Sequence, residues 1–140
     1  MMPALDISTS ALVAQRLRMN AISSNLANMS STRNENGEIE PYQARYVVLQ
    51  TDDSLKTAQG AVGVKVASVE TETVEPRYKY EPGNPLAIKS GKWKDYVAYP
   101  AVNMTTEMVD ALEASRAYEA NIGVMEMSKA MAQQTLRILG

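Results

Sequence analysis

The fold is decided by residues 105–139, TTEMVDALEASRAYEANIGVMEMSKAMAQQTLRIL. Apolar and small residues recur here at alternating steps of three and four, which predicts one long helix with a coiled-coil-like seam. Asn103 or Thr105 is expected to cap its start. The predicted seam contains Met104, Met108, Ala111, Ser115, Tyr118, Ile122, Met125, Ala132, Leu136 and Leu139, with Lys129 in one slot.

A second helix is predicted near the other end of the chain, over residues 4–29. Leu5, Leu12, Met19 and Leu26 recur there every seven residues, as on one face of a helix. The polar cluster at residues 30–37 ends this helix, and its last two residues, Asn-Gly, are typical of a tight turn.

The middle of the chain, residues 32–103, has the pattern of β structure. Alternating or β-branched residues predict short strands, and the Glu-Pro-Gly-Asn-Pro run at residues 81–85 predicts a turn. A polar loop is expected between the first two strands, at residues 52–60. The predicted strands cover residues 42–51, 62–66, 77–80 and 93–99.

These elements predict an α+β fold in which the two terminal helices pair antiparallel as a coiled-coil-like layer. At 1.5 Å per residue the helices would be roughly 40 and 50 Å long, so each apolar stripe needs another helix. We expect the β region to sit at one end of the helix pair, and leftover apolar residues to face other subunits. The expected parts are residues 1–31, the N-terminal helix; 32–103, the β-rich insertion; and 104–140, the C-terminal helix.

Composition argues against most enzyme classes. The 140-residue chain contains neither His nor Cys, which removes the commonest general base, thiolate nucleophiles and most metal ligands. No nucleotide-binding glycine motif is present. We therefore expect no enzymatic activity, no catalytic residue, no cofactor and no metal site.

The charge pattern and the apolar runs bear on partners and location. The formal charge of −2 is spread along the chain, so nucleic acid is not an expected partner. No run of about 18 apolar residues predicts a membrane span. The first residues lack the basic and apolar regions of a Sec-type signal, so export, if it occurs, is expected without a cleaved signal.

Four polar residues lie within the predicted helices. Asn25 and Asn28 are three residues apart; Asn28 either ends its helix in the αL conformation or, with Asn25, bonds a packed neighbour. Arg116 lies between Glu113 and Glu119, which fits either a surface ion pair or an interface cluster with Tyr118 and Asn121. We hypothesise that four residues set the register of packed helices: Asn25, Asn28, Arg116 and Asn121.

Several motifs resemble those of one bacterial family. Residues 24–28, Ser-Asn-Leu-Ala-Asn, resemble the Asn-Leu-Ala-Asn signature near the start of flagellar rod and hook proteins. Further matches follow in order at residues 80–87, YEPGNPLA; 96–103, YVAYPAVN; 107–110, EMVD; and 114–121, ASRAYEAN. The later block is similar to a proximal-rod member of the flagellar basal-body rod protein family.

This resemblance implies a structural subunit of the flagellar basal-body rod, the shaft that transmits motor torque. It implies export through the flagellar type III apparatus, assembly in the periplasm, and terminal helices that line the export channel. The implied partners are other copies, the rod proteins FlgB, FlgF and FlgG, and the FliE adaptor. Two departures are Ala101, where the family often has Asn, and the absence of Phe, which early export motifs often contain.

The alternative is a helical adaptor or regulatory protein-binding module, which would use the same helices to bind one or two partners. A rod subunit enters an open helical array, whereas an adaptor forms closed complexes, so stoichiometry distinguishes the two. The residues expected at subunit interfaces are Leu12, Met19, Asn25, Leu26, Asn28, Met108, Arg116, Tyr118, Asn121, Ile122, Met125 and Leu136.

Overall fold

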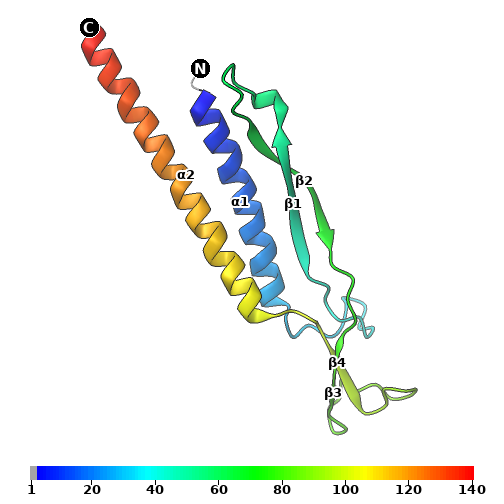
Figure 1. Cartoon of the computed structure of the whole chain (residues 1–140). Coiled ribbons are helices and arrows are strands. Elements are labelled where there is room, and N and C mark those ends of the chain that lie inside the picture. The colour runs from blue at the N-terminus through cyan, green and yellow to red at the C-terminus, as the bar shows by residue number, and fades with distance from the viewer. Residues whose placement is uncertain (1–2) are drawn as a thin grey trace.

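Two long antiparallel helices form one side of the molecule. The structure, a computed structural model, describes residues 3–140. Helix α1 spans Pro3–Ala27 and helix α2 spans Met104–Leu139, so both predicted helices are confirmed to within a few residues. Figure 1 shows α2 extending beyond the start of α1 toward the C-terminus.

The ends of α2 are capped by local hydrogen bonds. The side-chain oxygen of Asn103 accepts from the backbone N–H groups of Thr105 (3.0 Å) and Thr106 (3.2 Å), which have no partner inside the helix. At the other end the Gly140 N–H donates to the Leu136 carbonyl at 3.1 Å. Asn103, rather than Thr105, is therefore the N-cap.

The β structure consists of two separate two-stranded antiparallel sheets rather than one. Strands β1 (Arg45–Asp52) and β2 (Gly63–Thr71) form a long hairpin, and a 3-10 turn at Asp53–Leu55 lies in the loop between them. Strands β3 (Arg77–Tyr80) and β4 (Tyr96–Tyr99) form the short sheet. Strand β3 has the predicted bounds, whereas β2 is longer and β4 shorter than the pattern indicated.

The position of the hairpin corrects one expectation. Only the β3–β4 sheet lies beyond the end of the helix pair, whereas the β1–β2 hairpin runs along α1, which is therefore sandwiched between the hairpin and α2 (Figure 1). Ser10 helps to hold the hairpin there, because its hydroxyl accepts from the Val64 N–H at 3.1 Å. Gly63 permits this approach, since a Cβ atom would lie 2.7 Å from Leu55 Cδ1 and 3.1 Å from the Ser10 hydroxyl.

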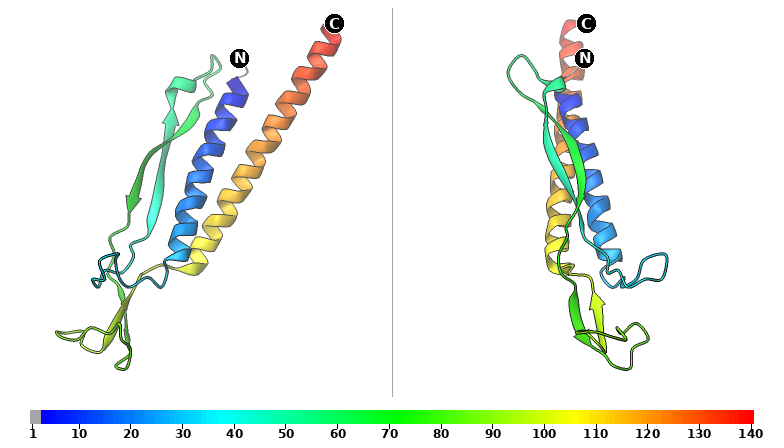
Figure 2. Two further views of the ribbon diagram at one scale, coloured as in Figure 1. Left: turned by 180° about the vertical axis from the view of Figure 1, so that it is seen from behind. Right: turned by 90° about the vertical axis from the view of Figure 1, so that its right-hand side faces the viewer.

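The helices pair closely only near the end where α1 finishes and α2 begins. Figure 2 shows that they diverge toward the two termini, unlike a regular coiled coil. Small side chains at the close end, including the fully buried Ala114, let the backbones approach, whereas larger residues such as Met125 and Leu136 occupy the diverging end. The antiparallel pairing is confirmed, while the coiled-coil geometry is not.

The chain buries little apolar surface for its size. Its buried hydrophobic residues are mostly Ala, with Ile22, Val97 and Val102 the only larger ones in the described part of the chain. The accessible surface is 9725 Å², whereas a compact monomer of 15.3 kDa would expose about 7,100 Å². Much of the surface is thus available to other molecules. Neither helix in residues 3–140 is long and apolar enough to cross a membrane.

The close helix contact predicts the effect of one substitution. Ala114→Leu should lower the free energy of unfolding by about 1–3 kcal/mol, because the added atoms enter a filled space. Ala120→Leu, on the exposed part of the same helix, should change it by less than about 0.5 kcal/mol. Urea unfolding measures both values, and equal effects would contradict the close contact.

Candidate subunit-interaction surface

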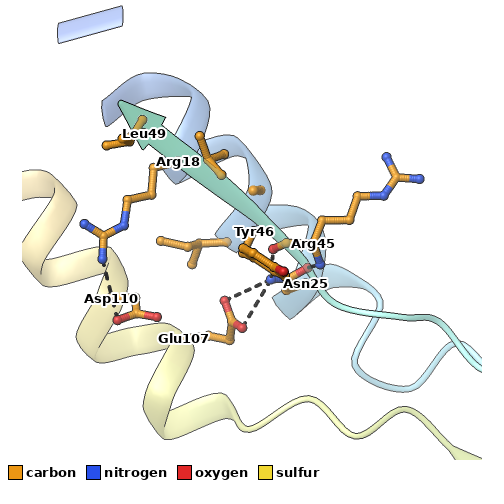
Figure 3. A pocket seen from close by; sticks show the side chains of 10 residues that line it. Arg18, Asn25, Arg45, Tyr46, Leu49, Glu107 and Asp110 are labelled. Carbon is orange, nitrogen blue, oxygen red and sulfur yellow. Dashed lines mark hydrogen bonds and ion pairs between the residues drawn. The ribbon is translucent and has the colours of Figure 1, made fainter. Parts of the chain in front are cut away.

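The buried side chain of Asn25 joins α1 to the hairpin. Its Nδ2 atom donates to the Arg45 carbonyl at 2.8 Å, and its Oδ1 atom accepts from the Arg45 N–H at 2.8 Å. These are the two bonds that a neighbouring β-strand would make with Arg45. The Asn25 side chain thus takes the place of a neighbouring strand at the first residue of β1 and links that strand to α1 (Figure 3).

The same side chain also reaches α2. The Nδ2 atom lies 3.2 Å from both carboxylate oxygens of Glu107, in the first turn of that helix, and the Tyr42 hydroxyl donates to Oδ1 at 2.9 Å. A neutral amide has two N–H donors and two acceptor lone pairs, so Asn25 is fully satisfied. One residue therefore ties α1, β1 and α2 together. Asn25 is one of the residues predicted from the sequence, whereas its bonding partners are not.

Ion pairs between the helices flank this junction. The Arg18 guanidinium lies 3.4 Å from Glu113 and 3.8 Å from Asp110, next to a cavity of about 370 Å³ between α1, β1 and α2. Exposed pairs of this kind contribute at most about 1 kcal/mol each. Of the two alternatives for Arg116, the surface ion pair is not formed within residues 3–140, because Glu113 turns to Arg18.

Asn28 and Asn121 bond locally in the chain. Asn28 donates to the Ser24 carbonyl at 3.0 Å and accepts from the Ser31 hydroxyl at 2.9 Å, so it closes the end of α1. It does so without the αL conformation, since Asp95 (φ 65°) is the only non-glycine residue of positive φ in the described chain. Asn121 donates to the Ala117 carbonyl of its own helix at 2.8 Å.

The apolar interface candidates fall into two groups. Leu12, Leu26, Tyr118 and Met125 are half-buried within the chain. The others are exposed although their side chains are large: Met19, Met108, Ile122 and Leu136, the last with 70% of its surface accessible. Met108 and Leu136 keep more than half of their surface accessible, as expected of residues that meet another molecule, whereas Met19 and Ile122 are each 37% exposed.

A second apolar stripe on α2 was not predicted from the sequence. Its members lie roughly opposite Ile122 of the predicted seam, at steps compatible with the same three- and four-residue spacing. Both Met127 (63% exposed) and Met131 (68% exposed) are highly accessible. The stripe contains Val109, Val124, Met127, Met131 and Ile138.

An apolar groove separates the diverging ends of the helices. It has a volume of about 320 Å³ and is lined by Leu5 of α1 and by Met125, Ala132 and Leu136 of α2, with Glu126, Lys129 and Gln133 at its edges. Together with the second stripe, it leaves apolar surface on two sides of α2. No group of His, Cys, Asp or Glu side chains within residues 3–140 is arranged to hold a metal ion.

Comparison with known families matches both segments that meet at Asn25. Residues 5–34 match the model described as "Flagella basal body rod protein". Residues 94–138 match the model described as "Flagellar basal body rod FlgEFG protein C-terminal". Asn25 and Glu107 fall one in each matched segment, so their contact joins the two parts that the family models describe.

Similarity to curated proteins extends over nearly the whole chain. The flagellar basal-body rod protein FlgC of Salmonella typhimurium is 45% identical over 95% of this chain and 93% of its own length. The chain belongs to the FlgC family of flagellar basal-body rod proteins. FlgC of Borreliella burgdorferi is 39% identical and FlgC of Bacillus subtilis 38% identical, each over 96% of this chain and 95% of its own length.

Membership of the FlgC family offers an explanation for the exposed apolar faces of α2. The chain is a structural subunit of the flagellar basal-body rod, and a rod is built from many packed subunits. The resemblance inferred from the sequence motifs is thereby confirmed. No comparison assigns an individual interface residue, so the residues expected at subunit contacts remain predictions.

The geometry at Asn25 predicts a large loss of stability for its truncation. Asn25→Ala should lower the free energy of unfolding by about 2–3 kcal/mol, because the Arg45 backbone groups lose their partners. Asn20→Ala, on the exposed face of α1, is the matched control and should cost less than about 0.5 kcal/mol. Urea unfolding is the measurement, and an equal loss in both variants would contradict the role of Asn25.

Proposed function

We propose that this structural rod subunit occupies the proximal part of the flagellar rod, where its terminal helices form an inner layer around the export channel. Residues 1–31 and 104–140 would make this layer, and the insertion at residues 32–103 would lie outside it. The observation that carries the proposal is the one-sided packing of α2. This 36-residue helix packs mainly on α1 and leaves two apolar faces open.

The amount of exposed apolar surface supports assembly rather than a solitary role. Water-exposed stripes of Met, Val and Leu are unfavourable in a monomer and favourable once another helix covers them. Because the stripe and the groove lie on different sides of α2, each subunit would contact at least two neighbours. Head-to-tail contacts between different surfaces build an open helical array when the rotation between subunits does not close into a ring, and a torque-transmitting shaft requires such an array.

The proposed neighbours follow from membership of the family. They are other copies of the chain, the rod proteins FlgB, FlgF and FlgG, and the FliE adaptor. We propose that the chain reaches the periplasm through the flagellar type III export apparatus. The proposal includes no enzymatic activity, no cofactor and no nucleic acid; the matched relatives are named as rod proteins.

Polar residues would set the register within this inner layer. Asn25 would have this role inside the chain, and its hydrogen bonds to the Arg45 backbone and to Glu107 support it. Arg116 is exposed, and we propose that it bonds a neighbouring subunit. The amides of Asn28 and Asn121 bond their own segments, so their remaining acceptor capacity would serve intersubunit contacts.

The proposed interfaces predict the effect of placing a charge in them. Met108→Asp, Ile122→Asp, Met125→Asp and Met131→Asp should each prevent rod assembly, because an unpaired carboxylate buried between helices costs several kcal/mol. Export should continue, since the chain is still made and transported. Motility in soft agar and electron microscopy of isolated basal bodies measure the result.

A control separates interface effects from general effects of added charge. Lys56→Asp places the same residue in the exposed loop between β1 and β2, and it should leave motility unchanged. If all four helix variants assembled complete rods, α2 would not be a buried interface helix.

A further inference from the structure

Charge is distributed unevenly over the β insertion. The segment from Arg77 to Tyr99, which forms the β3–β4 sheet and its connecting loop, contains five basic residues and two acidic residues, so its formal charge is +3. The whole chain carries −2. This segment projects beyond the helix pair (Figure 1), and we call it the basic tip: Arg77, Lys79, Lys89, Lys92 and Lys94.

The basic tip is held in shape by stacked aromatic rings. Tyr78 and Trp93 stack in parallel with ring centroids 4.1 Å apart, and the edge of Tyr96 meets Trp93 at 5.4 Å. The Lys92 ammonium lies 5.2 Å from the centre of the Trp93 ring, a cation–π contact. The loop with Lys89 and Lys94 therefore starts from a rigid platform.

Two lysines of the tip are free to meet a partner. Lys79 is paired with Glu81 at 2.7 Å, and this ammonium lowers the pKa of the Glu81 carboxyl below its ordinary value. Lys89 and Lys94 are exposed, and their ammonium groups form neither a hydrogen bond nor an ion pair within residues 3–140. Their charges are therefore not neutralised by an ion pair within the described chain.

Six exposed glutamates form a negatively charged surface at the base of the β1–β2 hairpin. They come from residues 34–43 and 70–75, two stretches without a single basic residue. The stretches are neighbours, because the Gln43 side chain bonds both the N–H (3.2 Å) and the carbonyl (3.4 Å) of Val74. We call this surface the acidic face: Glu35, Glu38, Glu40, Glu70, Glu72 and Glu75.

The acidic face also contains a cavity large enough for a side chain. The cavity has a volume of about 470 Å³, and its lining includes the acidic Glu35 and Glu40 and the basic Arg33 and Arg45. Arg33 donates to the Gly37 carbonyl at 2.9 Å, which partly occupies its guanidinium. Within the described chain, no ion pair links a glutamate of this face to the basic tip.

We propose that the basic tip of one subunit docks on the acidic face of a second copy of the chain. The inference rests on the proposed rod function and adds a contact between insertions to the contacts between helices. Complementary charges orient and align two surfaces more than they add affinity, which suits a repeated contact that must keep one register. Two different surfaces on one chain also give the head-to-tail contact that a growing array needs.

A second copy fits better than an external polyanion. The positive charge of the tip and the negative charge of the face are carried by the same chain, so each subunit supplies both halves of the contact. An external polyanion would use the tip alone and leave the acidic face without a role. Substitutions in the acidic face therefore distinguish a second copy of the chain from an external polyanion.

The test exchanges the charges of the two surfaces. The tip variant carries Lys89→Glu and Lys94→Glu; the face variant carries Glu35→Lys and Glu72→Lys, whose side chains form no hydrogen bond in residues 3–140. A third strain carries all four changes. The control carries Lys56→Glu and Lys65→Glu on exposed residues of the hairpin and its loop. It changes the net charge by the same amount as the tip variant. Complete basal bodies are counted per cell, and circular dichroism checks folding.

The tip variant and the face variant should each reduce the number of complete basal bodies per cell by about tenfold. The strain with all four substitutions should restore that number, and the control should equal wild type. The proposal would be overturned if the strain with all four substitutions did not regain complete basal bodies, or if the tip variant kept the wild-type number. A harmful tip variant beside a harmless face variant would also overturn it, in favour of an external polyanion. A gene deletion that left rods complete would instead refute the rod function itself.

Discussion

The arrangement of the chain depends on the hydrogen bonds of Asn25. This amide bonds the backbone of Arg45 as a β-strand would, and it also meets the Glu107 carboxylate at the start of α2. A second link, from Ser10 to Val64, holds the far part of the hairpin on α1. The base of the helix pair is therefore fixed by polar contacts, whereas its far end is held by few contacts and diverges.

A fixed base and an open end are expected of a subunit whose apolar surface becomes buried only when neighbouring subunits pack against it. The fixed base gives every copy the same relation between helices and insertion. The open end keeps apolar surface on two sides of α2, and the whole chain exposes about a third more surface than a compact monomer of its mass. A free subunit so built would be marginally stable, and burial between neighbours would supply the missing stabilisation.

The sequence predicted the parts of the structure that depend on local periodicity. Both helices follow from their apolar spacing, and β3 and the Asn103 cap follow from short patterns and side-chain chemistry. The position of the hairpin was missed because strand alternation does not show which helix a hairpin covers. The partners of Asn25 lie 20 and 82 residues away, so no local pattern reveals them. The second stripe of α2 was missed because, in a helix rich in Ala and Met, three- and four-residue steps fit more than one face.

The central claim is that assembly buries the second apolar stripe of α2, and the absence of cysteine from the sequence makes this directly measurable. A single Met131→Cys substitution can be labelled with a maleimide in the free subunit and in isolated basal bodies. Met131 is 68% exposed in the chain, so the thiol should react readily in the free subunit and be strongly protected in the rod. Denaturing the same basal bodies should restore labelling. Equal labelling rates in the free subunit and in the intact rod would contradict the claim.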